Sequence, residues 1–204
     1  GRRDFQWRDD DAASIVWAEA LDDGDPAKAV PRRDRLSVLA APFKGEPRAL
    51  GVTKNRFQGI TWGEAGIAIV SDFRWKDRSV KQYVFRTDRD NPDPRVLFEY
   101  SSENLYGLPG DFVTAPNARD RQVLLTGKDG SKLYLEGEGY SPEGNRPFVD
   151  EYDLSTAKTS RLWRADGVAT YEQIVRVLEV NKKKEILTRI EGTTQDITER
   201  VAAE

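Results

Sequence analysis

The feature that most constrains the fold of this chain is a series of short apolar runs, each bounded by turn-forming residues. The runs span residues 14–20, 36–41, 65–70, 80–85, 95–100, 122–126, 132–136, 148–154 and 159–163. Gly, Pro and Asp gather between them, at residues 22–26, 43–47, 91–94, 128–130 and 141–144. Short runs separated by residues that accept turn dihedrals indicate strands rather than helices.

The segment of residues 168–180 allows two interpretations. Tyr171, Ile174 and Leu178 have helical spacing, but the segment is rich in β-branched residues, and a second apolar run begins at Ile186. We therefore predict a β-hairpin, with the basic residues 182–184 in a solvated turn rather than a phosphate-binding patch. Residues 194–204 are expected to form a short terminal helix or a frayed end.

A weak repeat of about fifty residues runs through the pattern. Trp7 and Trp62 each precede an apolar run, and the sequence Pro-Arg-Ala-Leu at residues 47–50 returns as Pro-Arg-Val-Leu at residues 94–97. A period of ~40 to 50 residues with four strands per unit is typical of propeller blades. We predict an all-β fold, a partial β-propeller of three to four four-stranded antiparallel blades. The expected blades are residues 1–55, 56–105, 109–167 and a partial blade at 170–192, followed by a tail at 193–204.

This blade register predicts which residues are buried. Trp17, Ile69 and Leu124 should be buried on inner or middle strands, whereas residues 22–25 should form an exposed turn. An incomplete ring leaves sheet faces uncovered at both ends, so we expect self-association through the end blades or marginal stability.

The composition excludes several classes of chemistry. The chain of 204 residues has no Cys, no His and no Met, and a formal charge of −3. Cysteine nucleophiles, disulfides, thiolate zinc sites and Ser-His-Asp catalysis are therefore closed to it. No run approaches the ~18 apolar residues of a membrane span, and the interspersed charges do not suggest a nucleic-acid partner. Without Met, residue 1 is expected to be a cut edge of a processed or longer chain, and the compartment stays open.

One short motif resembles a catalytic one. Ser155 and Lys158 match the S-x-x-K pattern in which a lysine deprotonates a serine. The partner motifs of such enzymes are absent, so we interpret residues 153–159 as the turn between the third and fourth strands of a blade.

Acidic clusters suggest two further sites, neither of which the spacing favours. A propeller glycosidase would need a carboxylate pair from a set of five, Glu136, Glu138, Asp150, Glu151 and Asp153. A calcium loop would use Asp88, Asp90 and Glu99, but Pro92 and Asp93 stand where a ligand and a glycine are needed. We expect solvated faces and Asp-capped turns, hence no catalytic, cofactor or metal residue in this chain.

Several loop and strand phrases resemble a known family. They are residues 5–8, 17–22, 24–26, 59–63, 75–76, 101–103, 106, 109–110, 141–148, 153–154 and 161–163. Together they resemble the β-propeller domain of glutamyl-endopeptidase-like members of the prolyl oligopeptidase (S9) family, over residues 1–192. In that family the catalytic Ser, Asp and His lie in a separate C-terminal α/β-hydrolase domain. This sequence has no G-x-S-x-G elbow and no His, so no catalytic residue carries over.

The resemblance implies a non-catalytic segment that caps a catalytic domain of the same parent chain and restricts the access of peptide substrates. A stand-alone protein-interaction module is the alternative from another class, and a glycan-acting propeller is a third. A catalytic G-x-S-x-G sequence downstream in the parent gene would support the first hypothesis, and a stop codon would support the second.

Overall fold

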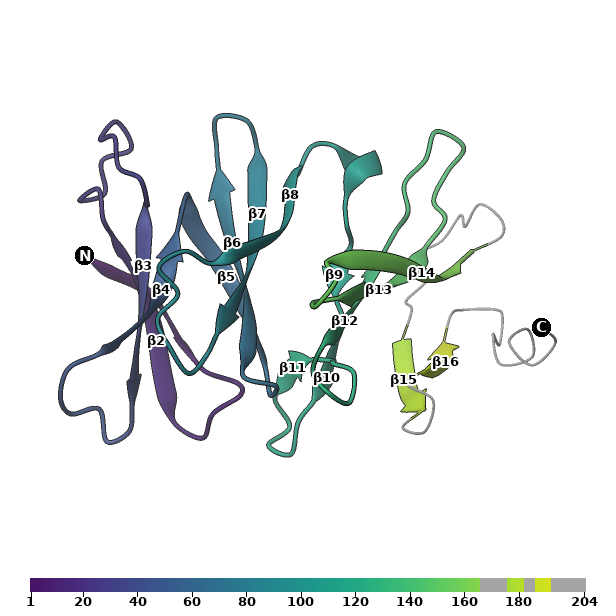
Figure 1. Ribbon diagram of the computed structural model, residues 1–204. Helices are drawn as coiled ribbons and strands as arrows, with labels where there is room; N and C mark the ends of the chain where they lie inside the picture. Colours follow the sequence, from purple (N-terminus) through teal and green to yellow (C-terminus); the bar gives the residue numbers. More distant parts are fainter. Residues whose placement is uncertain (166–175, 182–185, 192–204) are drawn as a thin grey trace. The chain divides into compact units, whose positions relative to one another are not determined.

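The computed structural model describes residues 1–165, 176–181 and 186–191 (Figure 1). Within these residues the chain forms β-strands and one 3-10 helix, Leu105–Gly107, with no α-helix. The predicted all-β class, with four-stranded antiparallel sheets of a partial propeller, is confirmed. The chain divides into two units, the first of residues 1–107 and 114–124, the second of residues 108–113 and 125 onward.

Unit 1 contains two four-stranded antiparallel sheets, each a simple meander of consecutive strands. The first sheet is β1 (Arg2–Trp7), β2 (Ser14–Ala20), β3 (Asp34–Ala40) and β4 (Arg48–Thr53). The second sheet is β5 (Arg56–Gly63), β6 (Ile67–Arg74), β7 (Ser79–Arg86) and β8 (Arg95–Ser101). Along the chain, Lys54 and Asn55 lead directly from β4 of the first sheet to β5 of the second.

The core of unit 1 lies between these sheets. One face of the first sheet contributes Val16, Ala18, Leu36, Val38 and Leu50, and the second sheet contributes Phe57, Trp62, Ala68, Val70, Tyr83 and Phe85. Alternate residues of β2 and β3 share this face because side chains alternate along a strand. The predicted burial of Trp17, Ile69 and Leu124 is also confirmed, since each is less than 5% exposed.

Unit 2 contains a third four-stranded antiparallel sheet, in the order β14-β13-β12-β9. Its strands are β9 (Asp111–Phe112), β12 (Lys132–Gly137), β13 (Phe148–Asp153) and β14 (Lys158–Arg164). Leu133, Leu135 and Val149 are fully buried in it. Beyond it, β15 (Arg176–Asn181) and β16 (Ile186–Glu191) pair as an antiparallel hairpin, as predicted. The predictions for residues 166–175, 182–185 and 192–204 lie outside the described residues.

The strand expected at residues 122–126 is shorter than predicted and pairs elsewhere. It is β11 (Gln122–Leu124), which pairs with β10 (Thr114–Pro116) in a separate two-stranded sheet of unit 1. Thr126 alone bridges to β12, at Leu133. Asn117, in the turn of the β10–β11 hairpin, donates from Nδ2 to the carbonyl of Asp9 at 2.9 Å, which ties the hairpin to unit 1.

The repeat in the sequence corresponds to equivalent places in the sheets. Trp7 and Trp62 both lie in the first strand of a sheet, and Arg48 and Arg95 both begin the last strand. The two tryptophans differ in burial, however, since Trp62 is 1% exposed and Trp7 is 52% exposed. Within unit 1, no strand of the second sheet therefore covers Trp7 as the core of that unit covers Trp62.

Candidate functional site

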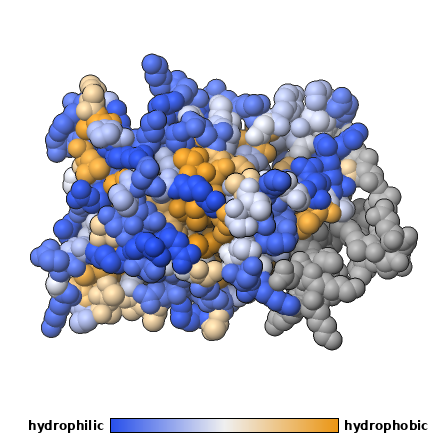
Figure 2. Space-filling model, in the orientation of Figure 1, coloured by the Kyte–Doolittle hydropathy of each residue, from blue (hydrophilic) through white to orange (hydrophobic). Residues whose placement is uncertain are grey.

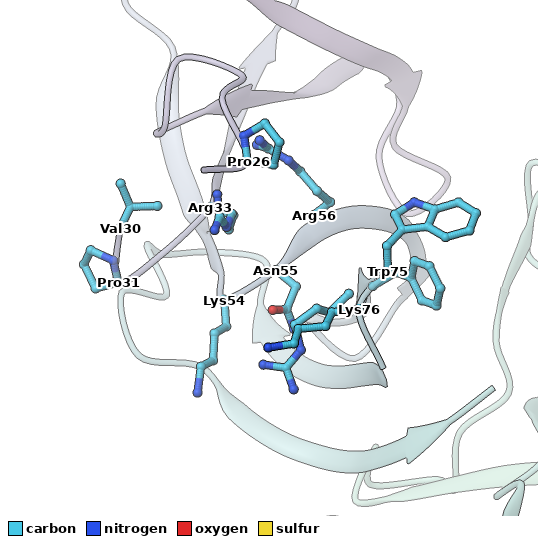
Figure 3. A pocket seen from close by; sticks show the side chains of 11 residues that line it. Pro26, Val30, Pro31, Arg33, Lys54, Asn55, Arg56, Trp75 and Lys76 are labelled. Atoms are coloured by element: carbon cyan, nitrogen blue, oxygen red, sulfur yellow. The ribbon is translucent and has the colours of Figure 1, made fainter. Parts of the chain in front are cut away.

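The meander topology brings alternate connections to one edge of unit 1. In antiparallel sheets of consecutive strands, every second connection falls on the same edge. The β2–β3 loop, the β4–β5 turn and the β6–β7 turn meet there around a hollow of about 510 Å³, which we call the cationic pocket (Figure 3). Its lining residues are Pro26, Val30, Pro31, Arg33, Lys54, Asn55, Arg56, Phe73, Arg74, Trp75 and Lys76.

Asp22 lies beneath the pocket, and its burial corrects the expectation of an exposed turn at residues 22–25. The side chain of Asp22 is fully buried, although the next three residues are exposed. Its Oδ2 accepts hydrogen bonds from Arg33 and Arg56, each at 2.6 Å. Burial opposes ionisation of Asp22, but these guanidinium groups outweigh it and hold the pKa of the carboxyl far below its usual range. Pairing with distant arginines explains why this aspartate is turned inward.

Two more buried carboxylates hold the same edge together. Asp34 accepts hydrogen bonds from Arg56 at 3.1 Å and from the Phe57 backbone N–H at 2.6 Å. Asp72 accepts from both the backbone and side-chain N–H groups of Asn55, at 2.8 and 2.9 Å, and from the Tyr83 hydroxyl at 2.7 Å. Burial and the neighbouring Asp72 raise the pKa of Tyr83, so its hydroxyl stays a donor. The connection between the two sheets is thereby fixed by side-chain bonds.

The charge lining the pocket is positive. Five lining residues are cationic, Arg33, Lys54, Arg56, Arg74 and Lys76, and none is acidic. Asp22 pairs with Arg33 and Arg56, and Asp34 also pairs with Arg56. Asp77 pairs with Arg74 through a bidentate contact. Lys54 and Lys76 are exposed and form no ion pair within the residues that the structure describes. Two cations are thus available to a ligand.

An aromatic side chain stands at the rim of the pocket. Trp75 is 73% exposed, yet it is held by its neighbours. The ring of Phe73 meets it edge to face at 5.4 Å between centroids, and the guanidinium of Arg78 lies 4.2 Å from its ring centroid. Cation–π and edge-to-face contacts orient a ring without covering it. Trp75 therefore presents a positioned apolar surface on the pocket that Lys54 and Lys76 also line, with Lys54 on the opposite side in Figure 3.

This arrangement is suited to binding rather than to proton transfer. The lining side chains provide cations, an amide and apolar walls, but no carboxylate, hydroxyl, thiol or imidazole. Sequence reasoning did not find the pocket, because its cations come from three separate connections and match no motif. The signal available was that these connections alternate along a meander, which places them on one edge.

The serine of the S-x-x-K match lies in the β13–β14 turn, as predicted. Ser155 donates its hydroxyl hydrogen to Asp153 Oδ1 at 2.5 Å, and the same oxygen accepts from the Ser155 and Thr156 backbone N–H groups. These bonds lower the pKa of Asp153 to about 2. Ala157, with a φ of 56°, completes a tight turn before β14. The motif is a capped turn.

The five carboxylates considered for a glycosidase are not brought together as a free pair. Glu151 pairs with Lys132 at 2.8 Å, Asp150 pairs with Arg161, and Glu138 accepts from Asn145 at 3.2 Å. Asp153 caps its turn. Glu136 is the fifth of these carboxylates, and burial and the neighbouring Asp111 raise its pKa.

Two of the three calcium candidates have cationic partners. Glu99 pairs with Lys81 across β7 and β8, and Asp88 interacts with Arg86 and Arg89. Asp90 is exposed. Residues 1–165 contain no group of three or more acidic side chains placed to hold a metal ion. In the same part of the chain, no helix has the length and apolar character that a membrane crossing needs.

Comparisons with known proteins relate the chain to one group of peptidases. No family model matches it. It is 32% identical over 208 residues to a probable chloroplastic glutamyl endopeptidase of Oryza sativa subsp. japonica, and 31% identical over 209 residues to one of Arabidopsis thaliana. Each alignment covers 96% of this chain and 22% of the relative, so the chain spans about a fifth of those proteins.

The comparison with solved structures gives more distant matches. Prolyl oligopeptidase B from Galerina marginata has a TM-score of 0.42 and 13% identity, over 86% of this chain and 22% of that one. A putative dipeptidyl aminopeptidase IV from Bacteroides ovatus has a TM-score of 0.46 and 10% identity, over 88% and 28%. The sequence relatives confirm the resemblance found in the loop and strand phrases: the chain is similar, over nearly all of its length, to a segment of glutamyl endopeptidases of the prolyl oligopeptidase (S9) family.

Proposed function

We propose that this chain is a non-catalytic propeller segment of an S9-type serine peptidase, which caps the catalytic domain of its parent chain and restricts the access of peptides. The observation that carries the proposal is the alignment of 96% of the chain with 22% of each glutamyl endopeptidase. The absence of His and of a G-x-S-x-G elbow agrees with it, because the chemistry then belongs to another part of the parent.

The proposal includes a division into blades at residues 1–55, 56–105, 109–167 and a partial blade at 170–192. Sheets packed face to face around a ring enclose a passage too narrow for a folded protein, so selection is steric. The rigidity of such a ring depends on cores like the one between the two sheets of unit 1. Leu36 is fully buried there and contacts no solvent.

Loosening this core in the parent peptidase tests the capping role. The variant Leu36→Ala leaves a cavity between two sheets and should cost about 2 to 5 kcal/mol of local stability. If the propeller restricts access, the variant should cleave a folded protein faster relative to a short glutamyl peptide. Lys44→Ala, on an exposed loop, is the matched control and should leave the ratio unchanged.

An unchanged ratio in a Leu36→Ala variant that remains folded, as judged by circular dichroism and by full activity on the short peptide, would contradict the capping role. The stand-alone interaction module would then be the better hypothesis.

A further inference from the structure

The cationic pocket has surplus charge that the chain itself does not neutralise. Its five cations face three carboxylates, Asp22, Asp34 and Asp77, and the surplus is carried by Lys54 and Lys76. Both lysines are exposed, so their ammonium groups can adjust on flexible stems to an incoming anion. A hollow that is lined only by cations and neutral groups selects a negatively charged ligand.

The walls of the pocket indicate what carries that charge. Pro26, Val30 and Pro31 line one side from the β2–β3 loop, and Phe73 and Trp75 line it from the end of β6 and the following turn. A free inorganic anion has no apolar surface to bury against such walls, whereas a peptide can pack its backbone and the aliphatic parts of its side chains against them. Exposed aromatic side chains are surfaces on which extended, proline-rich peptide segments pack.

Trp75 is prepared for such a contact. Its ring is fixed by Phe73 and by Arg78, which in turn pairs with Glu103 at 3.3 Å. A ring that is already oriented loses little conformational freedom when a ligand covers it, so the contact gives more net affinity. The exposed fraction of 73% is the surface that a ligand would bury.

We infer that the cationic pocket binds an extended peptide segment with acidic side chains, whose carboxylates contact Lys54 and Lys76 and whose backbone lies against Trp75. The inference rests on the proposed function in one respect, that peptides reach the propeller. It concerns binding to this chain and needs no catalytic domain. It can therefore fail while the capping role stands, and the capping role can fail while the binding is observed.

Titration calorimetry with the chain of 204 residues tests the inference. The probe is a blocked peptide of alternating Glu and Pro, and its counterpart carries Gln in place of Glu. The acidic peptide should bind, with an affinity that falls as salt is added, and the Gln peptide should not bind measurably. Binding should also shift the indole N–H signal of Trp75, identified as the signal that Trp75→Phe removes.

Paired variants locate the contact. Lys54→Gln with Lys76→Gln should weaken binding about fivefold or more, since two exposed ion pairs are lost. Lys44→Gln with Lys128→Gln removes the same charge from exposed loops elsewhere and should leave the affinity unchanged. Equal binding of the two peptides, equal weakening by the two variant pairs, or tighter binding of ATP or a short oligonucleotide than of the acidic peptide would each overturn the inference.

Discussion

At the scale of single residues, buried aspartates hold connections of unit 1 in place, because neighbouring donors stabilise their charge. Asp22, Asp34 and Asp72 are all fully buried, and each accepts at least three hydrogen bonds from the same edge of unit 1. A buried carboxylate with that many donors is stabilised as an anion. These three side chains therefore link the start of the β2–β3 loop, β3 and β6 to the connections that form the cationic pocket.

We expect Asp22→Asn to destabilise the chain by about 2 to 3 kcal/mol, because Arg33 and Arg56 lose a shared buried partner while they keep some contact with water. The pKa of Asp22 is lowered in the folded chain, so its contribution is complete above the unfolded pKa of ~3.9 and is lost as the pH falls below it. Urea unfolding should show this difference in the free energy of unfolding between variant and wild type at pH 7, and a smaller difference at pH 3. Asp23→Asn removes only an exposed ion pair with Lys28 and should show a much smaller difference at pH 7.

Ser155 is the second residue with a testable role. We expect the chain to hydrolyse neither peptides nor acyl esters, because Ser155 is bonded to a carboxylate whose pKa of about 2 makes it a poor proton acceptor at neutral pH. Turnover of p-nitrophenyl acetate should match the buffer blank and be the same for Ser155→Ala. Turnover that the substitution abolishes would show that the turn is a nucleophile site after all.

At the scale of elements, the two sheets of unit 1 are joined by the loop between β7 and β8. Asn91 donates from Nδ2 to the carbonyls of Leu50 and Arg86, at 2.7 and 2.9 Å, and accepts from the Arg86 backbone N–H at 2.8 Å. This loop approaches β4 so closely that no side chain fits at Gly51. A Cβ there would lie 2.9 Å from the Asn91 carbonyl oxygen and would overlap the ring of Phe85.

Gly51→Ala should therefore cost about 1 to 3 kcal/mol, the usual range for overpacking a core. Gly59→Ala is a matched control in the neighbouring strand β5, because a Cβ at that position meets nothing within 4 Å. Thermal or urea unfolding of both variants measures the difference. Similar destabilisation by the two substitutions would contradict the packing described between β4 and the β7–β8 loop.

Sequence patterns predicted the elements better than their partners. The strands and turns followed from short apolar runs and from Gly, Pro and Asp, since those signals are local. Asp22 was predicted to be exposed because its partners Arg33 and Arg56 are 11 and 34 residues away and no pattern joins them. The pairing of residues 122–124 with β10 could not be predicted for the same reason, since it depends on the turn at Asn117 and its bond to Asp9.

At the scale of the whole molecule, one face of the first sheet carries exposed aromatic side chains. Phe5 stacks on Trp17 at 5.8 Å, and Trp7 contacts Phe43 at 5.9 Å between centroids. Phe5, Trp7 and Phe43 are 55%, 52% and 44% exposed. The side of the molecule that Figure 2 shows also carries apolar patches, which hydrophilic residues surround. Exposed aromatic clusters of this kind mark surfaces that pack on a partner.

We expect the isolated chain to self-associate through this face, so its weight-average sedimentation coefficient should rise with concentration. Trp7→Lys should reduce that rise, because a charge at the centre of the face opposes burial. Trp75→Lys changes a still more exposed tryptophan, in the cationic pocket, and should leave the rise intact. A strictly monomeric wild type, with uniform hydrogen-exchange protection through residues 1–20, would contradict the expectation of an open end.

The meander order of unit 1 also has a consequence for synthesis on the ribosome. All four strands of the first sheet are available once residue 53 has emerged, but the inner face of that sheet is covered only by strands that end at residue 86. At ~5 to 20 residues per second, the intervening 33 residues (86 − 53) take about 2 to 7 s to translate. During those seconds the core partners of Val16, Leu36 and Leu50 in the second sheet emerge one strand at a time, and Tyr83 and Phe85 of β7 come last. Chaperone binding to a nascent chain should therefore peak in this interval and fall as β7 is completed.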